Sequence, residues 1–263
     1  MTLKIGRHVA AIGFVASLLC GSANALTSGP PPISKSSSSR AGEFTVQNGI
    51  SDDDFQTSER LDTAYAMARK VVAQGDMANA IKALRLVAEA GHFLAMHDLA
   101  LLLRQANTKE SFAEAAIWYR RASEWRGIGF AGSQNNLGDM YETGEGLPKS
   151  GGDAIYWYTR SALQGEPTAY LSLGSCFAEG FGVRKDLVEA YFWLTLAVRE
   201  LGAGSNQDAA AKQLKEIEKA MTASQVAEAK SKADQFKPYY QTKLKIGDPF
   251  ERSTNEQPSG ASK

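Results

Sequence analysis

The sequence predicts an all-α domain made of antiparallel helix pairs, on three observations. Apolar and small residues recur at helical spacing in stretches of 12 to 16 residues, and between the two ends of the chain no stretch alternates like a strand. Short connections that end in glycine separate the stretches and favour antiparallel neighbours. A motif of alanine and tryptophan recurs along the chain. We expect about four stacked pairs with capping helices.

The first segment carries the marks of an export signal rather than of a folded element. Lys4 and Arg7 precede an apolar run at residues 9–19, and small residues follow at 23–25. The run is about half the ~20 residues that a membrane-spanning helix needs. We therefore expect residues 1–25 to be a signal peptide and the exported protein not to span a membrane.

Composition excludes one class of partner and one way of stabilising the fold. The 29 basic and 29 acidic side chains cancel, so no excess of positive charge is available for a nucleic-acid backbone. Loss of the signal peptide leaves Cys176 as the only thiol, so no internal disulfide can form. We expect a periplasmic protein held by packing, with secretion as the alternative and association with the cell envelope as an option.

Two segments outside the helical region are too poor in apolar side chains to order themselves. Residues 26–56 are rich in serine and proline and predict a flexible leader, with a docking peptide as the alternative. Residues 237–263 begin with Lys237-Pro238 after a helical pattern and predict a disordered tail. The α-solenoid is expected at 57–236.

The recurring motif places a tryptophan three residues after an alanine and another small residue seven or eight after it. Its alanines are Ala115, Ala154 and Ala190, with a weaker copy at Ala80, and they are 35, 39 and 36 residues apart. These offsets share one face of a helix, so the small residues admit a neighbouring helix and the indole fills the space between units. We expect Trp118, Trp157 and Trp193 to be buried.

The second half of each unit also repeats. Leu137-Gly138 and Leu173-Gly174 occupy the same place in their helices, and glycine-rich turns follow at 144–147 and 180–183. At the end of the array, Thr222 and Gln225 have the spacing of a capping box. The expected units are 77–104, 112–144, 150–180 and 186–220, with a C-terminal cap at 222–236.

These residues resemble the Sel-1-like repeat, a relative of the tetratricopeptide repeat. The match is close from Gly144 to Leu196 and weaker towards Met77, where the tryptophan and the glycine turn are missing. The resemblance implies a right-handed superhelical α-solenoid, because one helix pair cannot bury its apolar face alone. It also implies an array that holds complexes together or regulates a signalling receptor, an inference by analogy with the fold.

The sequence offers little for chemistry. His92, His97 and Cys176 are the only soft ligands after the signal peptide, and the two histidines are five residues apart, so we expect ordinary helix residues that do not pair. Cys176 occupies an apolar helix position and is expected to be a buried, unreactive thiol. The glycine turns lack the Lys-Ser/Thr of a phosphate loop. We expect no catalytic residue, no cofactor and no metal.

A binding surface should use positions that vary between the copies, because the others are committed to packing. Arginine and tyrosine at such positions suit a protein interface. The candidate partner-binding residues are Arg85, Arg120, Arg121, Tyr156, Arg160 and Tyr191.

The expected function is that of an exported, non-enzymatic scaffold. Its concave face would bind a partner protein or peptide and so regulate an envelope or signalling complex. One alternative is a cell-envelope enzyme acting on β-lactams or peptidoglycan, although the relatives of that type carry cysteine pairs that this chain lacks. Another alternative is a secreted effector directed at a host.

Overall fold

The computed structural model describes residues 58–238, and these form helices without a strand. The predicted signal peptide, the leader at 26–56 and the tail from 239 onward lie outside the described residues. The all-α solenoid predicted from the sequence is confirmed. The helices are α3 Ser58–Ala73, α4 Met77–Glu89, α5 Phe93–Gln105, α6 Lys109–Glu124, α7 Ala131–Thr143, α8 Gly151–Leu163, α9 Pro167–Glu179, α10 Leu187–Glu200, α11 Ser205–Glu218 and α12 Ala223–Gln235, with a short 3-10 helix η4 at Trp125–Gly127.

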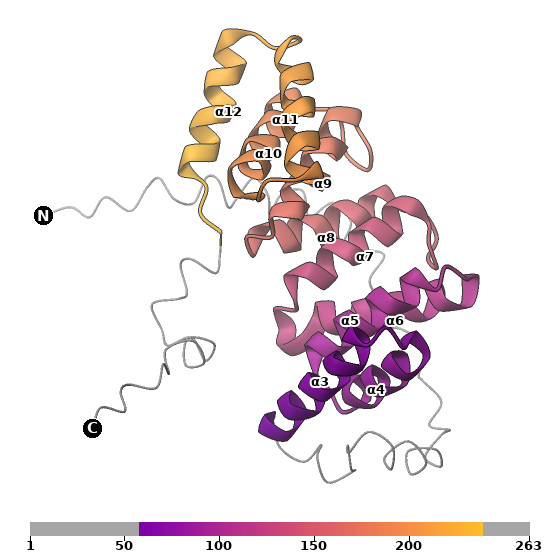
Figure 1. The fold of residues 1–263 in the computed structure, drawn as a ribbon. Helices are drawn as coiled ribbons and strands as arrows, with labels where there is room; N and C mark the ends of the chain where they lie inside the picture. Colours follow the sequence, from indigo (N-terminus) through magenta and orange to yellow (C-terminus); the bar gives the residue numbers. More distant parts are fainter. Residues whose placement is uncertain (1–57, 239–263) are drawn as a thin grey trace, which may run out of the picture.

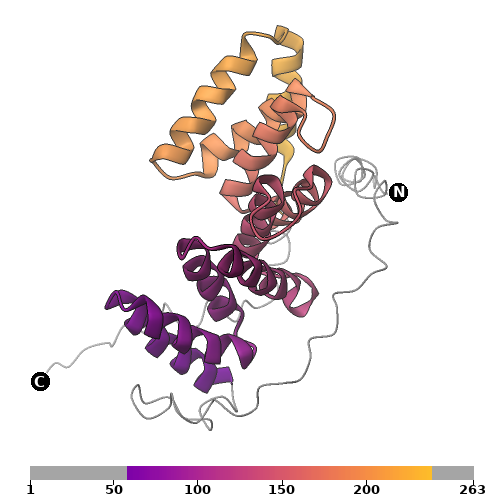
Figure 2. The ribbon, with the colours of Figure 1, turned by 90° about the vertical axis from the view of Figure 1, so that its right-hand side faces the viewer.

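Each helix packs chiefly on its neighbours in the sequence, so the array is nearly one-dimensional. Figures 1 and 2 show the stack rising in chain order from α3 to α10. The C-terminal end departs from this order. Helix α10 contacts α9, α11 and also α12, which lies across the last pair rather than extending the stack.

Local signals set where the helices begin and end. Thr108 and Thr222 each form a capping box, so the box predicted at Thr222 and Gln225 is confirmed. Gly144 and Gly180 end α7 and α9 in the left-handed conformation, with φ of 85° and 82°. Since a side chain is strained there, glycine is required at these two turns.

Two helical glycines allow the close approach that the repeat depends on. A Cβ at Gly138 would lie 2.6 Å from ring carbons of Tyr158 on the next helix. A Cβ at Gly174 would lie 2.6 Å from Cγ of Leu194 on α10. At both positions the following helix packs directly against the glycine, so a larger residue would force the two helices apart.

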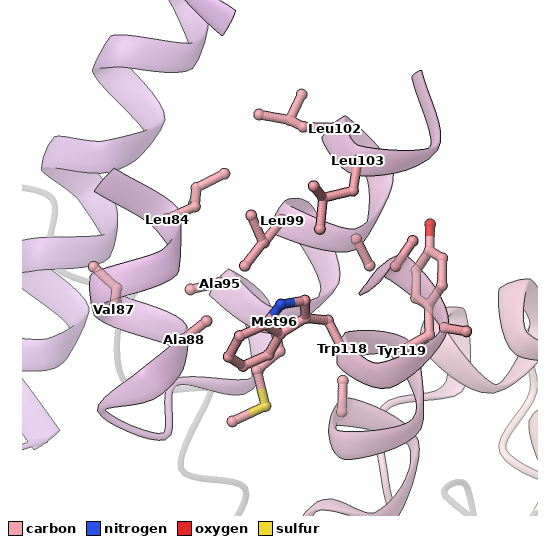
Figure 3. Close-up of a cluster of buried hydrophobic side chains, with 14 of the residues drawn as sticks. Leu84, Val87, Ala88, Ala95, Met96, Leu99, Leu102, Leu103, Trp118 and Tyr119 are labelled. Carbon is pink, nitrogen blue, oxygen red and sulfur yellow. The ribbon is translucent and has the colours of Figure 1, made fainter. Parts of the chain in front are cut away.

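The predicted burial of the three tryptophans is confirmed. Trp118, Trp157 and Trp193 are 5%, 4% and 3% exposed. Figure 3 shows Trp118 of α6 beside Met96 of α5, among the leucines of α5. Trp157 belongs to this same N-terminal cluster although it lies on α8, whereas most buried residues of α8 belong to a second cluster with α9 and α10. The indole of Trp157 therefore links the two halves of the core.

Candidate protein-binding face

The first helices of successive pairs carry an acid, an indole and an arginine at i, i+4 and i+7. On α6, the Trp118 Nε1–H donates to Glu114 Oε1 over 3.0 Å, and the Arg121 guanidinium lies 4.6 Å from the indole centroid. Arg85 of α4 reaches across to pair with the Glu114 carboxylate. The arrangement joins α4 to α6 through charge and shields the indole from water.

The same three positions on α8 are Asp153, Trp157 and Arg160. The Arg160 guanidinium lies 5.5 Å from the Trp157 centroid, and its Nη1 donates to Tyr156 Oη over 3.2 Å. Its Nη2 donates to the carbonyl oxygen of Gly127 over 2.9 Å. Arg160 thus holds the connection after α6 while leaving part of Tyr156 open to solvent.

One side of α6 faces solvent, and the residue at its centre is apolar. Ile117 is 50% exposed, with half-buried Glu114 and Arg121 on either side of it along the helix. We define the open face as the solvent-facing side of α4, α6 and α8. It comprises Arg85, Glu114, Ile117, Arg121, Asp153, Tyr156 and Arg160. An exposed aliphatic side chain flanked on its helix by a carboxylate and an arginine, with a tyrosine and an arginine on the next first helix, is typical of the centre of a protein interface.

Four of the six candidate residues from the sequence lie on the open face. They are Arg85, Arg121, Tyr156 and Arg160. Arg120 instead donates to the hydroxyl of Tyr141 on α7. The expectation that Tyr191 is available at a surface is wrong, because it is 2% exposed. Every residue of α10 from 190 to 197 is buried, since α9, α11 and α12 surround the helix.

Sequence reasoning missed the role of His92 and an aromatic cluster beside it. His97 is a helix residue, as expected, but His92 caps α5: its Nδ1 accepts from the backbone N–H of Ala95 over 3.2 Å. Its Nε2 lies 3.0 Å from Asp62 Oδ1, and its ring stacks on Tyr65. The expectation that His92 is an ordinary helix residue is therefore wrong. The sequence signal for this role was the position of His92, directly after a glycine turn and directly before the start of a helix.

Trp125, the fourth tryptophan, lies in the irregular connection after α6. Its ring centroid is 4.4 Å from that of Phe93, and Phe93 also contacts Phe130. Arg126 next to it has φ of 49° and covers the indole. The connection contains residues that the repeat does not have. The motif therefore could not predict where Trp125 lies.

A carboxyl pair shares one phenol between α7 and α8. Tyr158 Oη lies 2.8 Å from Asp139 Oδ1 and 2.6 Å from Glu142 Oε2. One phenolic hydrogen cannot satisfy two carboxylates, so the site favours an additional proton. Burial, together with the neighbouring Glu142 and Glu145, raises the pKa of Asp139 above 3.8, against the opposing effects of Tyr158 and Arg104.

This shift predicts that stability falls as the pH rises. Because the folded state raises the pKa of Asp139, it binds more protons than the unfolded state between 3.8 and the raised value. The free energy of unfolding should therefore decrease as pH increases through that interval. Asp139→Asn should flatten the slope, as urea unfolding between pH 4 and 7 will show. An identical slope in Asp139→Asn would contradict the assignment.

The buried thiol gives a second prediction. Cys176 is 1% exposed, and burial with nearby carboxylates raises its pKa to about 12. In a Cys20→Ser background, the native protein should react with a water-soluble thiol reagent at least about a hundredfold more slowly than the urea-unfolded protein. Fast labelling of the native protein would contradict the burial.

Metal binding and membrane insertion find no support between residues 58 and 238. No group of three or more histidine, cysteine, aspartate or glutamate side chains between 58 and 238 is placed to hold a metal ion. Within the same range, no helix has the length and apolar character to cross a membrane. The open face is therefore the feature for which a function is sought.

Comparisons with known proteins agree with the geometry. A model of the Sel1 repeat matches residues 93–124, 131–166 and 167–200. These units join α5 to α6, α7 to α8 and α9 to α10, one helix out of phase with the units drawn from the sequence motif. A stacked array can be divided either way, because each helix packs on both of its neighbours.

Two solved structures share the fold. One is a protective antigen present in uropathogenic Escherichia coli strains and displaying an SLR fold. It is similar over 78% of this chain and 42% of that chain, with a TM-score of 0.61 and 24% identity. The other is a Sel1 repeat protein from Oxalobacter formigenes, with a TM-score of 0.50 and 22% identity over 61% of this chain and 73% of that one.

A curated relative is similar over a shorter stretch. Chitin synthase regulatory factor 3 of Schizosaccharomyces pombe is 33% identical over 86 residues, which are 32% of this chain and 9% of that protein. The chain thus spans less than half of the antigen and under a tenth of the regulatory factor. These likenesses bear on the repeat array and not on the rest of those proteins.

The stacked helix pairs and the open face define an α-solenoid of the interaction-scaffold class. Within that class, residues 93–124, 131–166 and 167–200 are three Sel1 repeats, as the sequence resemblance predicted. Sel1 repeats usually mediate protein interactions.

Proposed function

We propose that this protein is an exported, non-enzymatic adaptor whose open face, the expected concave side of the array, binds a partner protein or peptide. The observation that carries the proposal is Ile117, a half-exposed aliphatic residue at the centre of a face lined by Arg121, Tyr156 and Arg160. Arginine and tyrosine are the residues that most often carry interface energy. Their contacts with buried indoles hold them in place, which lowers the entropy lost on binding.

The proposed cellular role is regulation of an envelope or signalling complex in the periplasm. Two features support it. The apolar run at residues 9–19 with its flanks has the character of a signal peptide. The relative in fission yeast is named as a regulatory factor, which suits an adaptor rather than a catalyst. On the open face, Glu114 accepts from the Trp118 indole and pairs with Arg85, and Asp153 accepts from the Ser150 hydroxyl, which leaves neither carboxylate placed as an activated nucleophile or a paired acid and base.

The proposal is tested by comparing two substitutions in cells. A tagged chain with Ile117→Asp should lose its specific co-purifying protein, because a charge at the centre of an apolar contact must be desolvated. Leu101→Asp is the matched control, because Leu101 is 36% exposed and lies on α5, which is not part of the open face. Equal recovery of the same protein by both variants would overturn the proposal, provided that both fold like the parent chain.

A further inference from the structure

The open face carries positive charge that the array does not neutralise. Of its three arginines, only Arg85 meets a carboxylate, that of Glu114. Asp153, the other acid of the face, lies in the first turn of α8 and Arg160 in the last, so roughly 10 Å of helix separates them. Among residues 58–238, no carboxylate lies within ion-pairing distance of Arg121 or Arg160.

Both guanidinium groups lie against indoles and keep N–H groups that the described chain does not use. Arg121 lies 4.6 Å from the Trp118 centroid and donates no hydrogen bond to the described residues. Arg160 donates to the Tyr156 hydroxyl and to two carbonyl oxygens of the connection after α6, which accounts for three of its five N–H groups. Because the rings already hold these side chains, a carboxylate that accepts from them loses little entropy in ordering them.

Other arginines of the array are paired with acids. Arg69, Arg104 and Arg199 each form an ion pair with a carboxylate from another part of the stack. Arg121 and Arg160 instead occupy equivalent places in successive units, three residues after the tryptophan, and neither has an acid. The repeat therefore presents the same unneutralised group twice.

Each of these arginines follows an apolar or aromatic side chain by one helical turn. Ile117 precedes Arg121 on α6, and Tyr156 precedes Arg160 on α8, at the i, i+4 spacing that places two side chains next to each other. On α10 the position of the arginine is taken by Leu196, which is 5% exposed, so the pattern ends at α8. We call each pair, an apolar group beside an unneutralised guanidinium, a half-site.

We propose that the segment bound by the open face is an acidic polypeptide, in which one carboxylate meets Arg121, another meets Arg160, and apolar side chains pack on Ile117 and Tyr156. The inference rests on the proposed function, because it specifies the chemistry of the partner of that face. The guanidinium fork matches the two oxygens of a carboxylate, and such charge-assisted bonds are stronger than neutral ones. A phosphate backbone could meet the arginines but would not cover the aliphatic Ile117.

The first test determines which peptides the face selects. The purified full chain is presented with a phage-displayed library of random dodecapeptides. We expect the recovered peptides to be enriched in aspartate and glutamate beside apolar residues, and the double variant Arg121→Glu with Arg160→Glu to lose that enrichment. No enrichment of acidic residues by the parent chain, or equal enrichment by the double variant, would overturn the proposal. If the recovered peptides are not acidic and Ile117→Asp abolishes their binding, the acidic partner is excluded and the proposed function stands.

The second test measures the part of each guanidinium with the best acidic peptide from the selection. In fluorescence anisotropy, Arg121→Gln and Arg160→Gln should each weaken its binding by at least about tenfold, since each removes a hydrogen bond to a charged group. Arg69→Gln is the matched control on α3, outside the open face, and should bind within about twofold of the parent chain. Circular dichroism verifies that the variants fold, and Arg121 is the safer position because it holds no hydrogen bond in the described chain.

A charge exchange separates direct contact from a structural effect. Arg121→Glu should bind a peptide with lysine in place of its acidic residues more tightly than the parent chain does, because the two charges then attract. Full affinity for the acidic peptide in both glutamine variants would contradict the proposal. So would tighter binding of a fluorescein-labelled oligothymidine than of the acidic peptide by the parent chain, which would make the face a site for a phosphate backbone.

Discussion

Replacing Trp157 by alanine is expected to lower the free energy of unfolding by about 4 kcal/mol. The indole is 4% exposed and belongs to the N-terminal core cluster while its helix, α8, packs mostly with the C-terminal one. The cavity would therefore open at the joint between the two halves. We also expect the single unfolding transition to separate into two, since nearest-neighbour contacts hold a solenoid together.

Urea unfolding followed by circular dichroism and by tryptophan fluorescence measures both effects. Ile117→Ala is the control, because a half-exposed side chain should change stability by less than about 0.5 kcal/mol. A loss below about 1 kcal/mol in Trp157→Ala, with one shared transition, would show that the indole does not join the two clusters.

Gly138→Ala is expected to destabilise the protein by about 3 kcal/mol, although alanine is the better helix former. The new methyl would lie 2.6 Å from the ring of Tyr158. That ring cannot easily move, since it is fully buried and its hydroxyl is bound to Asp139 and Glu142. Helices α7 and α8 must then separate.

Gly152→Ala is the matched control for this substitution. Nothing lies within 4 Å of a Cβ at Gly152 in the first turn of α8, so alanine there should be neutral or stabilise by up to about 1 kcal/mol. Thermal unfolding of the two variants side by side gives the difference. Equal melting temperatures would contradict the close contact between position 138 of α7 and the Tyr158 ring of α8.

The repeat could be predicted because its packing depends on the size of a few residues at fixed positions in each helix. Ala115, Ala154 and Ala190 are each fully buried, and the indole three residues later is nearly so. A small residue and a large one at fixed helical offsets leave few other arrangements. For this reason both the helix pairs and the interior position of the tryptophans followed from spacing alone.

The candidate site was predicted only in part, because a side chain's partner depends on helices far away in the sequence. Arg120 and Arg121 are adjacent, yet one reaches Tyr141 on α7 and the other covers Trp118. Tyr191 is buried in the α10 region that α12 helps to enclose, and no local pattern shows that α12 packs back onto α10. The Asp139–Tyr158–Glu142 contact likewise depends on the packing of α7 against α8.

The most direct test of the binding function is a scan with a photoreactive amino acid in living cells. One set of positions lies on the open face, at Ile117 and Arg121, and the other lies on helices outside it, at Met67 of α3 and Leu101 of α5, which are 37% and 36% exposed. We expect Ile117 and Arg121 to crosslink to one shared protein, and Met67 and Leu101 not to capture it. Capture of the same protein from Met67 or Leu101, with none from Ile117 or Arg121, would contradict a binding role for the open face.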